Sequence, residues 1–162
     1  ATSAMNTLAG TIDEVVFLGG NQYCRGAGVN VLSAAVINSL KLQDWNCNGA
    51  DYPLRLQGSA AINNVLVLGG ADTSPAANAR CVVIEGSGIK MATVRNRSLG
   101  ASMNSAIVVN SGVTNTPTLN VEDCNLDGLG TVNLSSSCEV RLSGNAITSN
   151  SNGVVQIGRA HV

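Results

Sequence analysis

Short stretches in which apolar and polar residues alternate recur along the chain at a nearly constant interval. In each stretch the first and third residues are aliphatic or aromatic, which is the pattern of a β-strand with one face turned to a core. One family of such stretches comprises Val29–Val31, Leu54–Leu56, Val82–Ile84, Ile107–Val109, Val132–Leu134 and Val155–Ile157. A second family comprises Val15–Phe17, Leu40–Leu42, Val65–Val67, Ile89–Met91, Leu119–Val121 and Val140–Leu142. Both families repeat at roughly 25 residues, so each repeat contains one strand of each kind.

Longer segments repeat with the strands, since Ser33–Leu42 resembles Ser59–Leu68 and Leu18–Gly20 recurs as Leu68–Gly70. A leucine-rich repeat has a similar period but needs an L-x-x-L-x-L pattern and a helical return, and this sequence has neither. The repeat therefore predicts an all-β fold, a right-handed parallel β-helix of about six coils of roughly 25 residues each. We expect residues 1–14 to form an N-terminal cap or anchoring arm, residues 15–158 the solenoid, and residues 159–162 a C-terminal tail.

Two segments, Asp44–Gly49 and Asp123–Gly128, match the start of a calcium-binding EF-hand loop. The twelfth loop position should be a bidentate carboxylate, but it is Arg55 in the first segment and Leu134 in the second. The sequence therefore predicts no metal site here, and chelator should leave the melting temperature unchanged.

The repeat itself explains both matches, because a polar residue follows each strand of the second family. Asn tolerates the left-handed backbone conformation and can bond neighbouring backbone, so it suits a sharp bend between strands. The predicted corner residues, stacked as a ladder, are Asn21, Asn46, Asp72, Asn96, Asn125 and Asn145. Loss of one of them, as in Asn125→Ala, is expected to lower stability.

Charge and cysteine content narrow the classes of function. The 162 residues are enough for one domain with a real core. Charged residues are only 12% of the chain, nine basic and ten acidic, which predicts no nucleic-acid or anionic-membrane partner. Five cysteines without a C-x-x-C pair indicate neither a disulfide framework nor a zinc knuckle, so they are interpreted as small apolar residues in a reducing compartment, and no cofactor is predicted. Without a basic, apolar leader or a long apolar run, the chain is expected to be unexported and not membrane-bound.

Groups suited to catalysis are few, and no catalytic residue is predicted. The single histidine, His161, lies in the predicted tail, where no third group can orient it. An alternative is a glycan-cleaving or glycan-binding site with Asp123 and Asp127 as an acid pair and Tyr23, Trp45 and Tyr52 as a stacking platform. A basic stripe on the second strand family, also open to a glycan, would consist of Lys41, Lys90 and Arg141.

Apolar residues also occupy positions that the strand pattern turns outward. Apolar side chains on a solvent face suggest burial against another chain, and low charge favours self-association. The predicted oligomer interface consists of Val16, Leu66, Val83 and Val108.

With its 25-residue coils from Val15 to Ile157, its Asn corners, its low charge and its Asn-, Ser-, Gly- and Val-rich composition, the chain resembles the trimeric parallel β-helix proteins of bacteriophage virions. These include tailspikes, fibres and small head decoration or cement proteins. The resemblance implies a homotrimer on the virion surface, assembled in the bacterial cytoplasm and bound to a capsid or tail lattice.

Tailspike depolymerases of this kind have many more coils and an acidic groove, so the short chain favours a non-enzymatic structural or cement role, with the N-terminal arm as lattice contact. Two alternatives stay open. One is a tailspike module that binds or degrades a bacterial surface glycan, and the other is a fragment of a bacterial surface adhesin.

Overall fold

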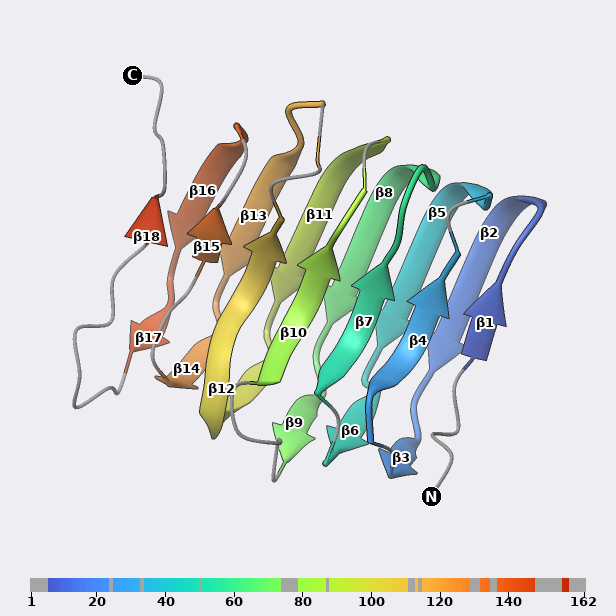
Figure 1. Cartoon of the computed structure of the whole chain (residues 1–162). Helices are drawn as coiled ribbons and strands as arrows, with labels where there is room; N and C mark the ends of the chain where they lie inside the picture. The colour runs from blue at the N-terminus through green and yellow to red at the C-terminus, as the bar shows by residue number, and fades with distance from the viewer. Residues whose placement is uncertain are drawn as a thin grey trace.

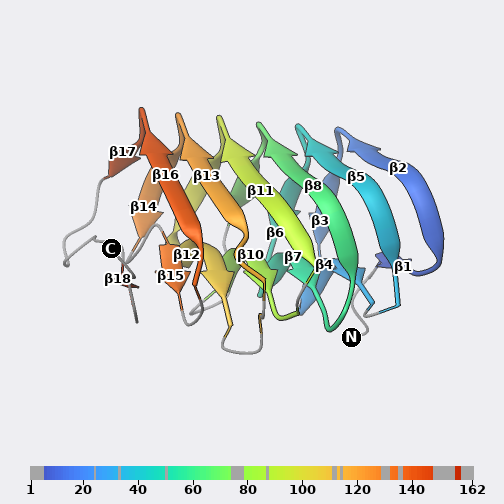
Figure 2. The same ribbon diagram turned by 90° about the horizontal axis from the view of Figure 1, so that it is seen from above.

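The chain is a parallel β-solenoid (Figures 1 and 2). The structure, a computed structural model, describes residues 6–23, 25–32, 34–49, 51–73, 79–86, 88–110, 113, 115–128, 132–134, 137–147 and 156–157. Throughout these residues the strands pair in parallel, as the repeat predicted. The described residues contain no helix that is long and apolar enough to cross a membrane.

One wall of the solenoid is a six-stranded sheet whose long strands are bent (Figure 2). In spatial order it contains β16 (Glu139–Ser143), β13 (Thr118–Glu122), β11 (Ile89–Arg95), β8 (Ala61–Leu68), β5 (Val36–Gln43) and β2 (Thr11–Leu18).

The remaining walls belong to a twelve-stranded sheet. One series of strands paired from coil to coil consists of β1 (Asn6–Leu8), β4 (Ala27–Val31), β7 (Tyr52–Leu56), β10 (Ala79–Ile84), β12 (Ser98–Val109), β15 (Val132–Leu134) and β18 (Gln156–Ile157). Its short corner strands are β3 (Asn21–Tyr23), β6 (Asn46–Asn48), β9 (Ala71–Thr73), β14 (Asn125–Gly128) and β17 (Ala146–Ile147). The long strand β12 pairs with strands of both groups and joins them.

The first predicted strand family is confirmed by the pairing of the twelve-stranded sheet. Its starting residues are neighbours from coil to coil, in the order Val29, Leu54, Val82, Ile107 and Val132. Leu134 pairs with Ile157 in the next strand, whereas Val155 lies outside the described residues.

The second family has the predicted strands, but its fourth member was aligned wrongly. Val65 pairs with Ala92, three positions beyond the predicted partner Ile89, which is aligned with Ile62. The error arose because the pattern was matched on large apolar residues, and alanine is small. Ala92 is nevertheless the buried core residue at this position. The correction removes Lys90 from the column of Lys41 and Arg141, so the predicted basic stripe does not exist. That column contains Val16, Lys41, Leu66, Thr93, Asn120 and Arg141.

The core fills about four turns, and not the six coils that the sequence predicted. Inward residues of the four middle strands are buried, for example Leu40 on β5 and Leu119 on β13. The two outer strands of the six-stranded sheet pack their inward residues against this core only partly, as Val15 on β2 and Val140 on β16 show. Each of them lacks a neighbouring coil on one side among the described strands, which explains the incomplete packing.

Part of the predicted N-terminal arm belongs to the solenoid walls. Asn6–Leu8 forms β1 and pairs with β4, and Thr11 begins β2, which pairs with β5. Residues 1–5 and the predicted tail 159–162 lie outside the described residues.

Candidate functional site

The two EF-hand-like segments begin at the left-handed corner that ends each strand of the six-stranded sheet. Asp44 has a φ of 52° and Asp123 a φ of 51°, and Asn96 has the same conformation with a φ of 52°. The other coils have glycines there, Gly19, Gly69 and Gly144, with φ values of 60°, 65° and 64°. Residues of the types that accept positive φ therefore recur at this corner, and the motif reflects backbone geometry.

The aspartates of this corner lie against glycines of the next coil. The Asp44 side chain extends over Gly69 in the next coil, where a Cβ atom would lie 2.2 Å from its Oδ1. Asp123 lies over Gly144 in the same way, at 2.0 Å. Among the described residues, no group of three or more His, Cys, Asp or Glu side chains could hold a metal ion.

The six predicted corner residues fall in several columns. Asn21, Asn46 and Asn125 lie in one column, in which Nδ2 of Asn46 donates to Oδ1 of Asn21 at 3.0 Å. Asn96 belongs to the left-handed column, whereas Asn145 accepts the backbone N–H of Cys124 at 3.0 Å. The sixth residue, Asp72, points into the core and is only 2% exposed.

Asp72 binds Arg97, a buried arginine that the sequence analysis did not single out. The guanidinium is bidentate on the carboxylate, with Nε–Oδ2 at 2.8 Å and Nη2–Oδ1 at 2.5 Å. Its Nη1 donates to the carbonyls of Trp45 and Gly69, both at 2.9 Å. Arg97 thus connects three successive coils from inside the solenoid.

Gly70 makes room for this arginine. It has a φ of +73°, and a Cβ there would lie 2.6 Å from the carbonyl oxygen of Trp45 and 2.9 Å from Nη1 of Arg97. Glycine is required here on two grounds, the left-handed backbone and the close approach of the guanidinium.

Two thiols lie beside the ion pair. Burial, reinforced by the nearby Asp72 carboxylate, raises the pKa of Cys81 well above its ordinary value, so this thiol stays protonated. Burial opposes the charge of Arg97, but the hydrogen-bonded Asp72 carboxylate raises the pKa of the guanidinium above its usual range. Cys47 and Cys124 are also buried, as expected for cysteines that serve as small apolar residues.

The predicted oligomer interface is only partly on the surface. Val83 and Val108 are neighbours on β10 and β12, but they are 1% and 4% exposed in the single chain. The expected exposed apolar column at these positions is therefore absent. Val16 is 40% exposed and Leu66 is half-buried, both on the outer face of the six-stranded sheet.

The candidate glycan site is not assembled as a stacking platform. Trp45 is 6% exposed and stacks inside the solenoid on Phe17, with ring centroids 5.2 Å apart. Tyr52 is half-buried under the guanidinium of Arg55. Asp123 is on the surface near Arg95, and the predicted pairing of its carboxylate with Asp127 lies outside the described side chains.

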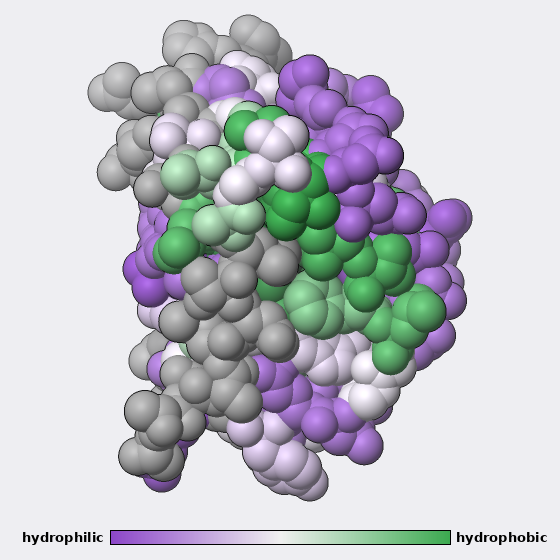
Figure 3. All heavy atoms as spheres, turned by 90° about the vertical axis from the view of Figure 1, so that its right-hand side faces the viewer, coloured by the Kyte–Doolittle hydropathy of each residue, from purple (hydrophilic) through white to green (hydrophobic). Residues whose placement is uncertain are grey.

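Apolar residues are exposed instead on the outer face of β2 and β5, the first two strands of the six-stranded sheet. Leu18 and Val16 on β2 are 70% and 40% exposed, and Val36 at the start of β5 is 48% exposed. Figure 3 faces the end of the solenoid at which β1 and β2 lie and shows hydrophobic side chains gathered in a patch, with polar side chains above and below it. Val16 and Leu18 project outward from β2, because their neighbours Val15 and Phe17 turn toward the core.

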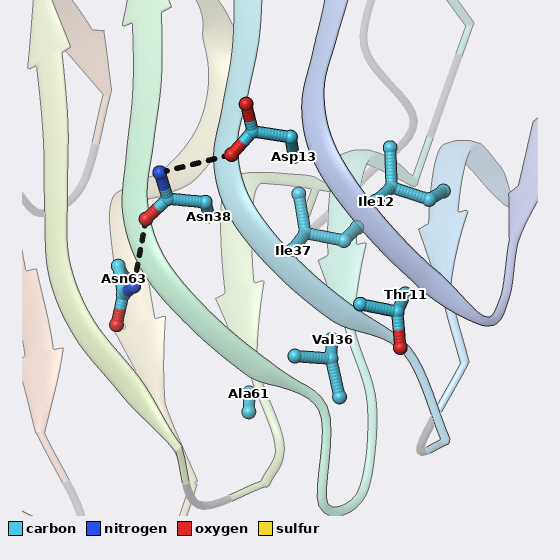
Figure 4. Close-up of a pocket in the computed structure, with 8 residues that line it drawn as sticks. All are labelled: Thr11, Ile12, Asp13, Val36, Ile37, Asn38, Ala61 and Asn63. Carbon is cyan, nitrogen blue, oxygen red and sulfur yellow. Dashed lines mark hydrogen bonds between the residues drawn. The ribbon is translucent and has the colours of Figure 1, made fainter.

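A shallow groove of about 240 Å³ lies at the opposite end of the same strands (Figure 4). Thr11, Val36 and Ala61, from three adjacent strands, form one side. The other side is a polar ladder in which Asn63 donates to Asn38 at 2.7 Å and Asn38 donates to Asp13 at 3.3 Å (Figure 4). We call this depression the Val36 groove.

Sequence reasoning missed both the Arg97 ion pair and the ladder beside the Val36 groove. A signal for each was present, because Arg97 and Asp72 are separated by 25 residues, as are Asn38 and Asp13. A search for polar residues spaced by one repeat, beyond the corner, would have found them.

Comparison of the chain with protein-family models, curated proteins and solved structures gives no match.

Proposed function

We propose that this chain is a non-enzymatic structural protein of a bacteriophage virion. In this proposal the solenoid is right-handed, three copies associate, and the trimer decorates or stabilises a capsid or forms part of a tail fibre or spike. The assembly takes place in the cytoplasm of the bacterial host.

The observation that supports the proposal is the exposed apolar surface on the first coils. Leu18, Val16 and Val36 project from a rigid sheet, and burial of such side chains against another chain is favourable. The whole chain has a net charge of only −1, so copies do not strongly repel one another. A stiff repetitive scaffold with an apolar contact surface suits a protein that acts by assembly.

Light scattering on the purified chain tests the assembly. A trimer has three times the chain mass of 16.4 kDa, and we expect that mass at micromolar concentration. A stable monomer at the same concentration contradicts the proposal. Antibody labelling of virions in electron micrographs tests whether the chain belongs to the virion surface, and we expect label on the capsid or tail.

The glycan-binding tailspike module remains the competing proposal, favoured only by the exposed Asp123 beside Arg95. The competing proposal predicts that the chain changes the size profile of a bacterial capsule or lipopolysaccharide and that Asp123→Asn abolishes the change. An unchanged profile with the wild-type chain leaves the structural role as the better account.

A further inference from the structure

Leu18 and the Val36 groove form a projection and a recess on one surface. Leu18 is the last residue of β2, and the groove lies where β2, β5 and β8 begin. Both therefore belong to the outer face of the six-stranded sheet, at opposite ends of its strands. At 70% exposed, Leu18 has the largest exposed fraction of any large aliphatic side chain in the described part of the chain.

The groove has the size and chemistry to accept a branched aliphatic side chain. Its volume is about 240 Å³, and the Val36 and Ala61 methyl groups supply an apolar contact. The polar side chains beside it are already hydrogen-bonded in a ladder, in which Asn63 donates to Asn38 and Asn38 donates to Asp13, so an apolar occupant does not break those bonds.

We propose that Leu18 of one copy of this chain inserts into the Val36 groove of a second copy. The inference rests on the proposed function, since it names the partner and the contact surface of that assembly. Because projection and recess are different patches, the contact is heterologous, and each copy uses both patches.

A heterologous contact closes into a ring only if the rotation between copies returns to the first copy without a rise along the axis, and otherwise it builds an open filament. Leu18 lies on β2, and the groove also includes residues of β2, together with residues of β5 and β8. The trimer of the proposed function requires the closed form.

Sedimentation velocity on three variants tests the contact. Leu18→Ser removes the projection and Ala61→Phe fills the recess, and each should raise the concentration for half-maximal assembly at least tenfold. Tyr23→Ser is the matched control, because Tyr23 is 75% exposed on β3 of the same coil but on another wall. It should leave assembly unchanged, and circular dichroism should show the same fold in all three variants.

Disulfide trapping provides a measurement that does not depend on stability. Oxidation of a mixture of Leu18→Cys and Ala61→Cys chains should produce a cross-linked pair, whereas neither variant should cross-link to itself beyond the parent chain. Self-linking of Leu18→Cys overturns the inference, because it indicates contact between two identical patches.

The outcomes separate this inference from the proposed function. A parent chain that forms trimers, with Leu18→Ser and Ala61→Phe assembling as tightly, overturns the Leu18 contact and leaves the trimer intact. A parent chain that is monomeric at micromolar concentration overturns the proposed assembly itself.

Discussion

Two arginines at one corner of the solenoid, Arg95 and Arg97, have opposite environments. The side chain of Arg95 is 52% exposed, and its Nε lies 3.3 Å from Glu122 and 3.8 Å from Asp123. The side chain of Arg97 is 0% exposed and is bidentate on Asp72. The left-handed residue Asn96 between them makes the corner between β11 and β12, so that one guanidinium points to solvent and the other into the core.

The comparison shows that burial decides what an ion pair contributes. Water already solvates Arg95 and its acids, so holding them together gains little free energy. Arg97 and Asp72 have both lost their hydration, so each depends on the other and on the carbonyls that the guanidinium binds. The inward apolar residues of successive coils are often alike, as Ile37 on β5 and its neighbour Ile62 on β8 show. The buried ion pair gives its own coils a feature that such residues do not provide.

Arg97→Met should have the largest effect on stability. It leaves the Asp72 carboxylate buried without its cation, and we expect the free energy of unfolding to fall by about 3–5 kcal/mol. The double variant Arg97→Met with Asp72→Leu should recover most of this loss, since no unpaired charge remains. Urea unfolding curves measure both, and a loss below about 1 kcal/mol in the single variant would contradict the role assigned to Arg97.

Gly70→Ala should have the next largest effect. Its Cβ would meet the Trp45 carbonyl and the Arg97 guanidinium, and forced overpacking costs about 1–3 kcal/mol. Gly20→Ala is the matched control, because Gly20 occupies the same corner position with a φ of +97° but has nothing within 4 Å of the added Cβ. Both variants carry the cost of positive φ, so the difference between their unfolding free energies isolates the contact. Equal losses in the two variants would remove the packing argument.

The thiol beside the ion pair should make stability depend on alkaline pH. The pKa of Cys81 is raised in the folded chain above its ordinary value of 9.0, so above this pH the unfolded thiol ionises while the folded thiol stays protonated. Stability is therefore retained below pH 9 and lost as pH rises, by about 1.4 kcal/mol per pH unit for one thiol. Cys81→Ser keeps a donor for Asp72 without this titration. Its unfolding free energy between pH 9 and pH 10.5 should fall less steeply than that of the parent chain.

Arg95→Ala should have the smallest effect. Exposed ion pairs contribute about 0–1 kcal/mol, and salt screens that contribution further. Thermal unfolding at low and high salt should show a small difference from the parent chain that disappears at high salt. A loss as large as that of Arg97→Met would mean that exposure does not distinguish the two arginines.

Much of the architecture was readable from the repeat. The spacing of strands such as Leu54–Leu56 and Val82–Ile84 predicted which residues pair, because stacked coils place equivalent residues next to each other. The alignment failed at Ala92, where the spacing changed and the inward residue was small. The number of packed turns was overestimated because a strand pattern does not reveal whether a coil has neighbours on both sides.

The sequence alone determined the all-β class, the parallel stacking and the absence of an EF-hand loop, since each follows from local pattern and repeat spacing. The three-dimensional structure was needed to place Arg97 and Asp72 in the core, to bury Val83 and Val108, and to expose Leu18 opposite the Val36 groove. Alternation along a strand shows which residues share a face. Whether that face meets solvent, core or another element depends on how the coils turn at their corners, and that turn brings distant residues together.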